Sequence, residues 1–163
     1  MSADKLTNYE SDILANIGKA GCFIPYVFDP DGIDPSFGYS VGFTTTVAQP
    51  EVITFGLPSD IVFHMINETL KQCREGLRLH DWCEINGLLE GHRCILRSVR
   101  AGAIEREFFS SANWYHKRTF GSLLGAAFQI VWPGTINKLF PWDEGCAIDV
   151  IQAQPALYAP RLH

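Results

Sequence analysis

The amino-acid sequence predicts an α+β fold: a mainly antiparallel twisted sheet or partly open barrel with two or three helices packed against it. Segments with helical apolar spacing are separated by groups of short segments with the alternating pattern of strands. Hydrophobic residues make up 47% of the chain and charged residues 19%, which is enough apolar material for a core. We expect a single domain over residues 1–163, with loosely held tails at 1–8 and 155–163.

The first half of the chain begins with a predicted helix over Tyr9–Lys19. Its apolar residues Ile13, Leu14 and Ile17 share one face, and Gly21 can end it. Turn-forming residues occur at 29–35 and at Gln49–Pro50, and they divide the next part of the chain into short extended segments. The strands predicted there are Cys22–Phe28, Phe37–Thr46 and Glu51–Leu57.

The second half begins with the clearest helix, Asp60–Glu75, for which Ser59 is the expected N-cap. Leu77–Ile85 and Leu88–Arg100 are predicted to form a hairpin that turns at Asn86–Gly87. Further along, the sequence indicates a helical turn at Glu105–Glu107, a break at Ser110–Asn113, a strand in the second half of Phe120–Val131, and a last strand at Ile148–Ile151.

Charge and cysteine content exclude several classes of protein. The formal net charge is -5, so we expect no nucleic-acid partner, and the basic stretch Arg93–Arg100 fits a solvated strand edge. No apolar run approaches membrane-spanning length, and the N-terminus has no apolar signal core. Five widely spaced cysteines suggest reduced, buried thiols. We therefore expect a cytoplasmic protein, without a membrane partner.

Three motifs carry possible chemistry, and each has a simpler explanation. Gly38–Gly42 matches G-x-S-x-G, but Phe43–Thr46 favours a strand where a nucleophile serine needs a helix. The acids of 29–35 have the wrong register for an EF-hand and suit an ordinary turn. The histidines lack the spacing of metal ligands. We therefore expect no catalytic residue, no metal and no cofactor.

The most unusual composition lies at Phe128–Pro133 and Phe140–Trp142, where two tryptophans adjoin prolines. Such rings can frame a rigid concave surface, with Gln129 orienting a polar ligand or a partner's backbone. Alternatively, Trp132 and Trp142 close one end of the core. Both interpretations stay open from the sequence.

These motifs, together with Pro35–Phe43 and Pro50–Leu57, resemble the bacterial domain-of-unknown-function family 4262. The resemblance runs from about Ile17 to about Gln154. Two departures are Gly134, where many members have an acidic residue, and Ser40, where members often have threonine, which argues further against a serine nucleophile. The resemblance implies a small cytoplasmic bacterial protein without a settled activity. It adds weight to the residues that carry its motifs: Tyr39, Glu51, Gln129, Trp132 and Trp142.

The function expected from these observations is non-enzymatic protein binding. The negative charge suits a basic protein partner, and an immunity or antitoxin-type inhibitor is one concrete form. A small-molecule or flavin-type cofactor-binding domain, with enzymatic activity or without, stays open, as does a homo-oligomer. The expected binding residues are Tyr39, Ser40, Glu51, Gln129, Trp132 and Trp142.

Overall fold

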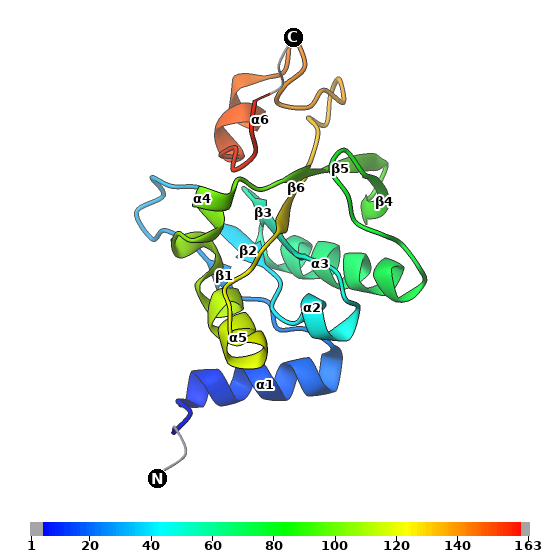
Figure 1. Ribbon diagram of the computed structural model, residues 1–163. Helices are drawn as coiled ribbons and strands as arrows, with labels where there is room; N and C mark the ends of the chain where they lie inside the picture. The colour runs from blue at the N-terminus through cyan, green and yellow to red at the C-terminus, as the bar shows by residue number, and fades with distance from the viewer. Residues whose placement is uncertain (1–4, 161–163) are drawn as a thin grey trace.

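The computed structural model describes residues 5–160 and confirms the α+β class, with an open six-stranded sheet (Figure 1). The strand order is β1-β2-β3-β6-β5-β4, and every neighbouring pair is antiparallel except β3 and β6, so the sheet is mixed. The strands are β1 (Tyr26–Val27), β2 (Phe37–Tyr39), β3 (Glu51–Phe55), β4 (Glu84–Leu89), β5 (His92–Ser98) and β6 (Ala127–Val131).

The helices lie before, between and after these strands. They are α1 (Asn8–Ala20), α2 (Phe43–Thr46), α3 (Ser59–Arg74), α4 (Ala101–Ile104), the 3-10 turn η1 (Glu107–Phe109), α5 (Ser110–Phe120) and α6 (Ile148–Ala153). None of the helices within residues 5–160 combines the length and hydropathy needed to cross a membrane.

Local sequence explains the two long helices α1 and α3. In α1, Thr7 and Glu10 form a capping box, and Gly21 ends the helix with φ 94°. The apolar stripe of α3 was also predicted correctly, but its N-cap was not: Pro58 occupies that position, and no side chain caps the helix. Because α3 buries its stripe against the sheet, tertiary packing compensates for the missing cap.

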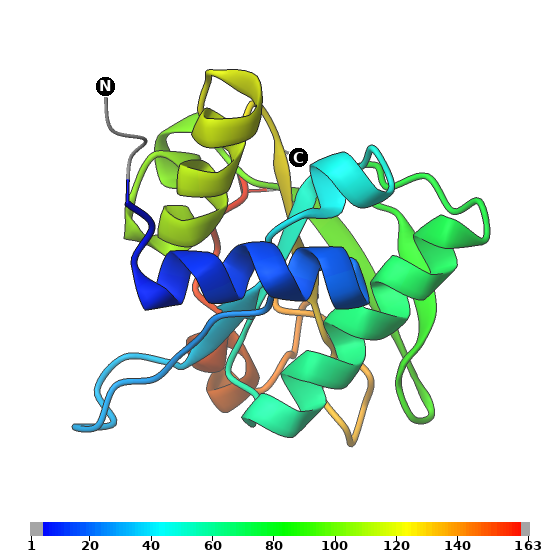
Figure 2. The same cartoon turned by 90° about the horizontal axis from the view of Figure 1, so that it is seen from below.

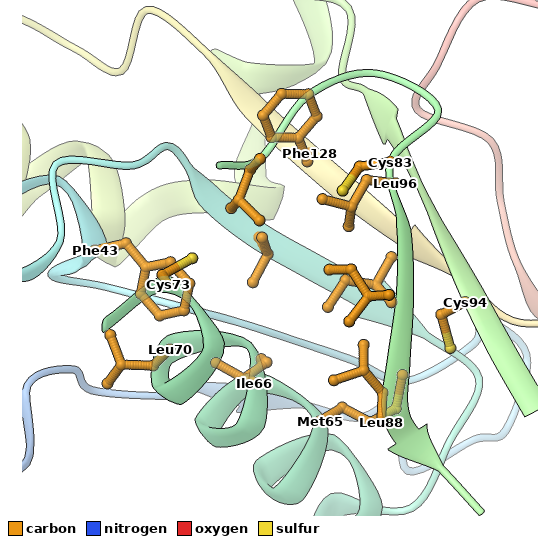
Figure 3. Close-up of a cluster of buried hydrophobic side chains, with 14 of the residues drawn as sticks. Phe43, Met65, Ile66, Leu70, Cys73, Cys83, Leu88, Cys94, Leu96 and Phe128 are labelled. Atoms are coloured by element: carbon orange, nitrogen blue, oxygen red, sulfur yellow. The ribbon is translucent and has the colours of Figure 1, made fainter. Parts of the chain in front are cut away.

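The core lies on both faces of the sheet. On one face, the α3 residues Met65, Ile66 and Leu70 pack against apolar side chains of β5 and β6 (Figure 3). Val52 of β3 belongs to this cluster, whereas its neighbour Ile53 belongs to a second cluster with α1, α4 and α5. Successive strand side chains point to opposite faces, so the second cluster lies on the other face.

The predicted strand Phe37–Thr46 is wrong in its second half. The strand stops at Tyr39, and α2 begins after Gly42, whose φ is 113°. The buried Glu51 carboxylate accepts hydrogen bonds from the amides of Gly42 and Phe43, which stabilises the helical turn. Local β propensity is therefore overridden by a contact with a later strand.

The predicted hairpin exists, but its turn was misplaced. β4 and β5 turn after Leu89, at Glu90–Gly91, and Asn86–Gly87 lies inside β4 at an irregularity of the pairing. β5 is also an interior strand between β4 and β6, so the expected solvated edge at Arg93–Arg100 is wrong for Arg97, which is buried.

Other boundaries also differ from the predictions. Of the predicted strand Cys22–Phe28 only Tyr26–Val27 joins the ladder, while Phe23 forms an isolated bridge with Val41. The expected break at Ser110–Asn113 is the start of α5, and the expected last strand at Ile148–Ile151 is helix α6. The second half of Phe120–Val131 is a strand, as predicted.

The C-terminal segment packs against the sheet in its described part. Leu157 and Tyr158 are buried, and Tyr158 forms an isolated bridge with Val99. Of the tails expected at 1–8 and 155–163, residues 1–4 and 161–163 lie outside the described residues, and Asn8 already belongs to α1. Within 155–160, Leu157 and Tyr158 are therefore packed, whereas Ala159 and Pro160 are exposed.

Candidate functional site

The G-x-S-x-G segment folds as the end of β2 and a turn that leads into α2, and its serine is enclosed in the core. Ser40 is 0% exposed. Its hydroxyl donates to Glu51 Oε1 at 2.7 Å and accepts a hydrogen bond from the Val52 amide at 2.9 Å. A nucleophilic serine must present its hydroxyl at a surface. The Ser40 hydroxyl instead links β2 to β3.

Glu51 is a buried carboxylate that three donors surround. Besides the Ser40 hydroxyl, it accepts from the amides of Gly42 at 2.9 Å and Phe43 at 3.1 Å. Burial raises the pKa of Glu51 to about 7, although the hydrogen bonds from Ser40, Gly42 and Phe43 act in the opposite direction. Glu51 thus titrates near neutral pH while it holds the start of α2.

Gln129 and Trp132 hold the C-terminal segment and β3. The buried Gln129 amide donates to the Pro155 carbonyl and accepts from the Leu157 amide, both at 2.9 Å. The Trp132 indole donates to the Phe55 carbonyl at 2.8 Å, and the Trp132 amide donates to Gln154 Oε1 at 3.0 Å. The polar groups of both side chains are therefore engaged within the chain.

Trp142 belongs to an aromatic cluster that encloses Arg97. The Trp142 ring stacks on Phe140, with centroids 5.1 Å apart, and meets the edges of Trp82 and Tyr158. The Arg97 guanidinium lies 3.9 Å from the Trp82 ring centroid and 4.8 Å from that of Tyr158. Its Nε donates to Asp81 at 3.0 Å. The cluster anchors β5 to the C-terminal segment through cation–π and ionic contacts.

A cleft of about 480 Å³ with a mostly apolar lining lies at the β1–β3 end of the sheet. Its floor contains a row of cross-strand neighbours, because Val27 pairs with Phe37 and Phe37 pairs with Phe55. Phe108 of η1 packs against both phenylalanines, with ring centroids at 5.5 and 5.7 Å. We call this the Phe-lined cleft; its lining residues are Val27, Phe28, Asp29, Asp34, Pro35, Phe37, Phe55, Glu107, Phe108 and Pro155.

Exposed apolar side chains continue the cleft onto the loop between β1 and β2. This loop projects from the body of the molecule in both views (Figures 1 and 2). Phe28 is 64% exposed and Ile33, further along the loop, is 80% exposed. Large apolar side chains at this exposure beside a concave surface are typical of binding sites.

The charged residues that line the cleft are all acidic. The Asp29 carboxylate accepts hydrogen bonds from the amides of Asp31, Ile33 and Asp34, which hold its pKa below the usual value. These hydrogen bonds fix the conformation of the loop. Within residues 5–160 no cluster of metal-binding side chains is found. The cleft therefore presents carboxylates next to aromatic rings.

None of the six residues predicted from the sequence lines the Phe-lined cleft. Ser40 and Glu51 are hydrogen-bonded to each other. Of the other four, Tyr39 accepts a hydrogen bond from the Ser111 amide, Gln129 and Trp132 both bond to the C-terminal segment, and Trp142 joins the Arg97 cluster.

Sequence reasoning missed the residues of the cleft and the role of Arg97. A usable signal was present, since Phe28–Asp29 and Glu107–Phe108 each place a phenylalanine beside an acid. Their proximity in space depends on strand pairing and on the position of η1, which no local pattern reveals.

Comparison with known proteins gives one match. A family model described as a domain of unknown function, DUF4262, matches residues 16–147. No curated protein and no solved structure matches the chain. The matched region includes the floor of the Phe-lined cleft and both of its acid–phenylalanine pairs, but not Pro155.

Proposed function

Because the chain belongs to the DUF4262 family, whose description assigns no activity, we propose a function from its own surface: non-enzymatic binding of a protein partner at the Phe-lined cleft. The observation that carries this proposal is the exposure of Phe28 and Ile33 beside a cleft floored by Phe37 and Phe55. Leaving such side chains in water is unfavourable, and a partner that covers them gains the free energy of their burial.

Charge selects the kind of partner. Three carboxylates line the cleft, and the whole chain has a formal net charge of -5, so a basic partner gains association rate and specificity. An immunity or antitoxin-type inhibitor of a basic toxin is the concrete form we propose. Five free cysteines support a reducing location, the cytoplasm of a bacterial cell.

Site-specific photo-crosslinking tests this function. A benzoyl-phenylalanine replaces Phe28 in the cleft or, as a control for random collision, Ile136, which is 96% exposed and does not line the cleft. We expect one basic protein to be captured from the native cell at position 28 and not at position 136. Equal capture at both positions, or none at position 28, would contradict a docking site at the cleft.

A second candidate function is the binding of a small molecule in the same cleft. The volume of about 480 Å³ lies within the range of ordinary ligand pockets, and a flavin-type cofactor is one class of ligand that would absorb visible light. A native mass spectrum and an absorbance spectrum of the freshly purified protein separate the two functions. A bound small mass supports this candidate, and a bare protein mass supports the protein partner.

A further inference from the structure

Two of the cleft carboxylates have no ion-pair or hydrogen-bond partner among residues 5–160. Within residues 5–160, the ion pairs are Arg93–Glu84 and Arg97–Asp81, and neither Asp34 nor Glu107 uses its carboxylate in a hydrogen bond. Asp29 differs, since its carboxylate is engaged by loop amides. Asp34 and Glu107 therefore have their full capacity to accept hydrogen bonds from a bound group.

The apolar floor between these carboxylates has the character that a long aliphatic chain needs. Val27, Phe37 and Phe55 form a continuous cross-strand row, and Phe108 extends it. Aromatic rings also attract cations through their negative faces. The cleft thus combines an apolar floor, aromatic rings and two unpartnered carboxylates.

We infer that the Phe-lined cleft binds a lysine or arginine side chain of the protein partner, an inference that rests on the proposed function. The methylene stem lies against Val27, Phe28 and Phe108, above the buried rings of Phe37 and Phe55, and the cationic head meets Asp34 and Glu107. Long basic side chains bury their stems on apolar surface in this way while their charge stays at a polar edge.

Other side chains fit the cleft less well. An acidic group would face three carboxylates without a lining cation to offset them. A purely apolar group would cover the floor but partly desolvate Asp34 and Glu107 without giving them a hydrogen-bond donor. A lysine or arginine side chain satisfies both parts of the cleft.

Three hexyl compounds that differ only in charge test the inference: hexylammonium, 1-hexanol and hexanoate. Each is titrated into isotope-labelled protein at pH 7 and followed by amide chemical shifts. We expect all shifts to centre on 27–35 and 107–108, with hexylammonium binding about three- to tenfold more tightly than 1-hexanol, and hexanoate most weakly.

A variant with D34N and E107Q should lose the preference for hexylammonium and keep the affinity for 1-hexanol. The matched control is D12N with E144Q, which removes the same charge from exposed residues outside the cleft. Equal affinity for all three compounds at the cleft would overturn the cation inference and leave the docking site intact. The same would follow if the control variant lost the preference as fully as the cleft variant. Shifts confined to another surface, together with no crosslink from position 28, would overturn both the inference and the proposed function.

Discussion

The buried carboxylate of Glu51 makes the stability of the fold depend on pH in an unusual direction. Its pKa is about 7 in the folded protein, against an ordinary value of 4.5. Between these values the folded state keeps a proton that the unfolded chain has released. The free energy of unfolding therefore falls as pH rises from 4.5 towards 7, and it levels off above 7 because Glu51 is then ionised in both states.

The size of this effect follows from the two pKa values. Each unit of difference corresponds to about 1.4 kcal/mol, so Glu51 lowers the free energy of unfolding by about 3 kcal/mol between pH 4 and pH 8. That is a large share of the stability of a small domain, which is about 5–15 kcal/mol. The three donors at Ser40, Gly42 and Phe43 are already included in the shifted pKa.

Urea unfolding followed by tryptophan fluorescence measures the effect, with E51Q as the reference. Glutamine does not titrate, so the pH dependence of the variant contains only the other groups. E51Q itself costs stability at pH 4, because its amide donor faces backbone donors. We expect the difference between wild type and E51Q to shrink by about 3 kcal/mol from pH 4 to pH 8. A difference that stays constant with pH would refute the account of Glu51.

Three further substitutions test the packing. Gly56→Ala should lower the free energy of unfolding by about 2 kcal/mol more than Gly76→Ala. Both glycines have positive φ, but only at Gly56 would the new Cβ lie 2.6 Å from a backbone oxygen of α6. Urea unfolding that gives equal costs for the two variants would contradict this. Gln129→Leu leaves a carbonyl and an amide of the C-terminal segment unpaired, so it should cost about 2 kcal/mol and speed cleavage of that segment by a protease; an unchanged cleavage rate would contradict its anchoring role. Arg97→Met should lower the free energy of unfolding by about 2 kcal/mol and change tryptophan fluorescence. Substitution of the exposed Arg93 by Met should lower it by under about 0.5 kcal/mol in the same urea unfolding experiment. Equal effects would argue against the aromatic enclosure of Arg97.

The parts of the fold that local sequence determines were predictable. α1 and α3 have apolar residues at helical spacing, and both end beside a glycine that tolerates positive φ, Gly21 and Gly76. The strand at 127–131 is a short apolar run, and it too was recognised. In each case the local pattern and the tertiary contacts favour the same structure.

Prediction failed where a distant contact decides the local structure. Phe43–Thr46 has strand-forming residues, yet it is helical because Glu51 accepts from the amides at its start. Arg97 belongs to a basic stretch that suggests a solvated edge, yet strand pairing places it in the interior among aromatic rings. Neither contact could be found without the strand order.

The candidate site depends on the strand order in the same way. Sequence reasoning chose six residues by chemical type and by resemblance, and the polar groups of Ser40, Glu51 and Gln129 turn out to be hydrogen-bonded inside the chain. Phe55 and Phe108 become neighbours at the cleft only through the folding of the sheet and η1.

Hydrogen exchange of the free protein and of the complex captured at position 28 tests the docking site most directly. The account predicts slower exchange on binding for amides in 26–36 and 104–109, with unchanged exchange in α3 and α6, which do not line the cleft. Protection of α5 or α6, with 26–36 left unchanged, would show that the partner binds elsewhere and would contradict the account.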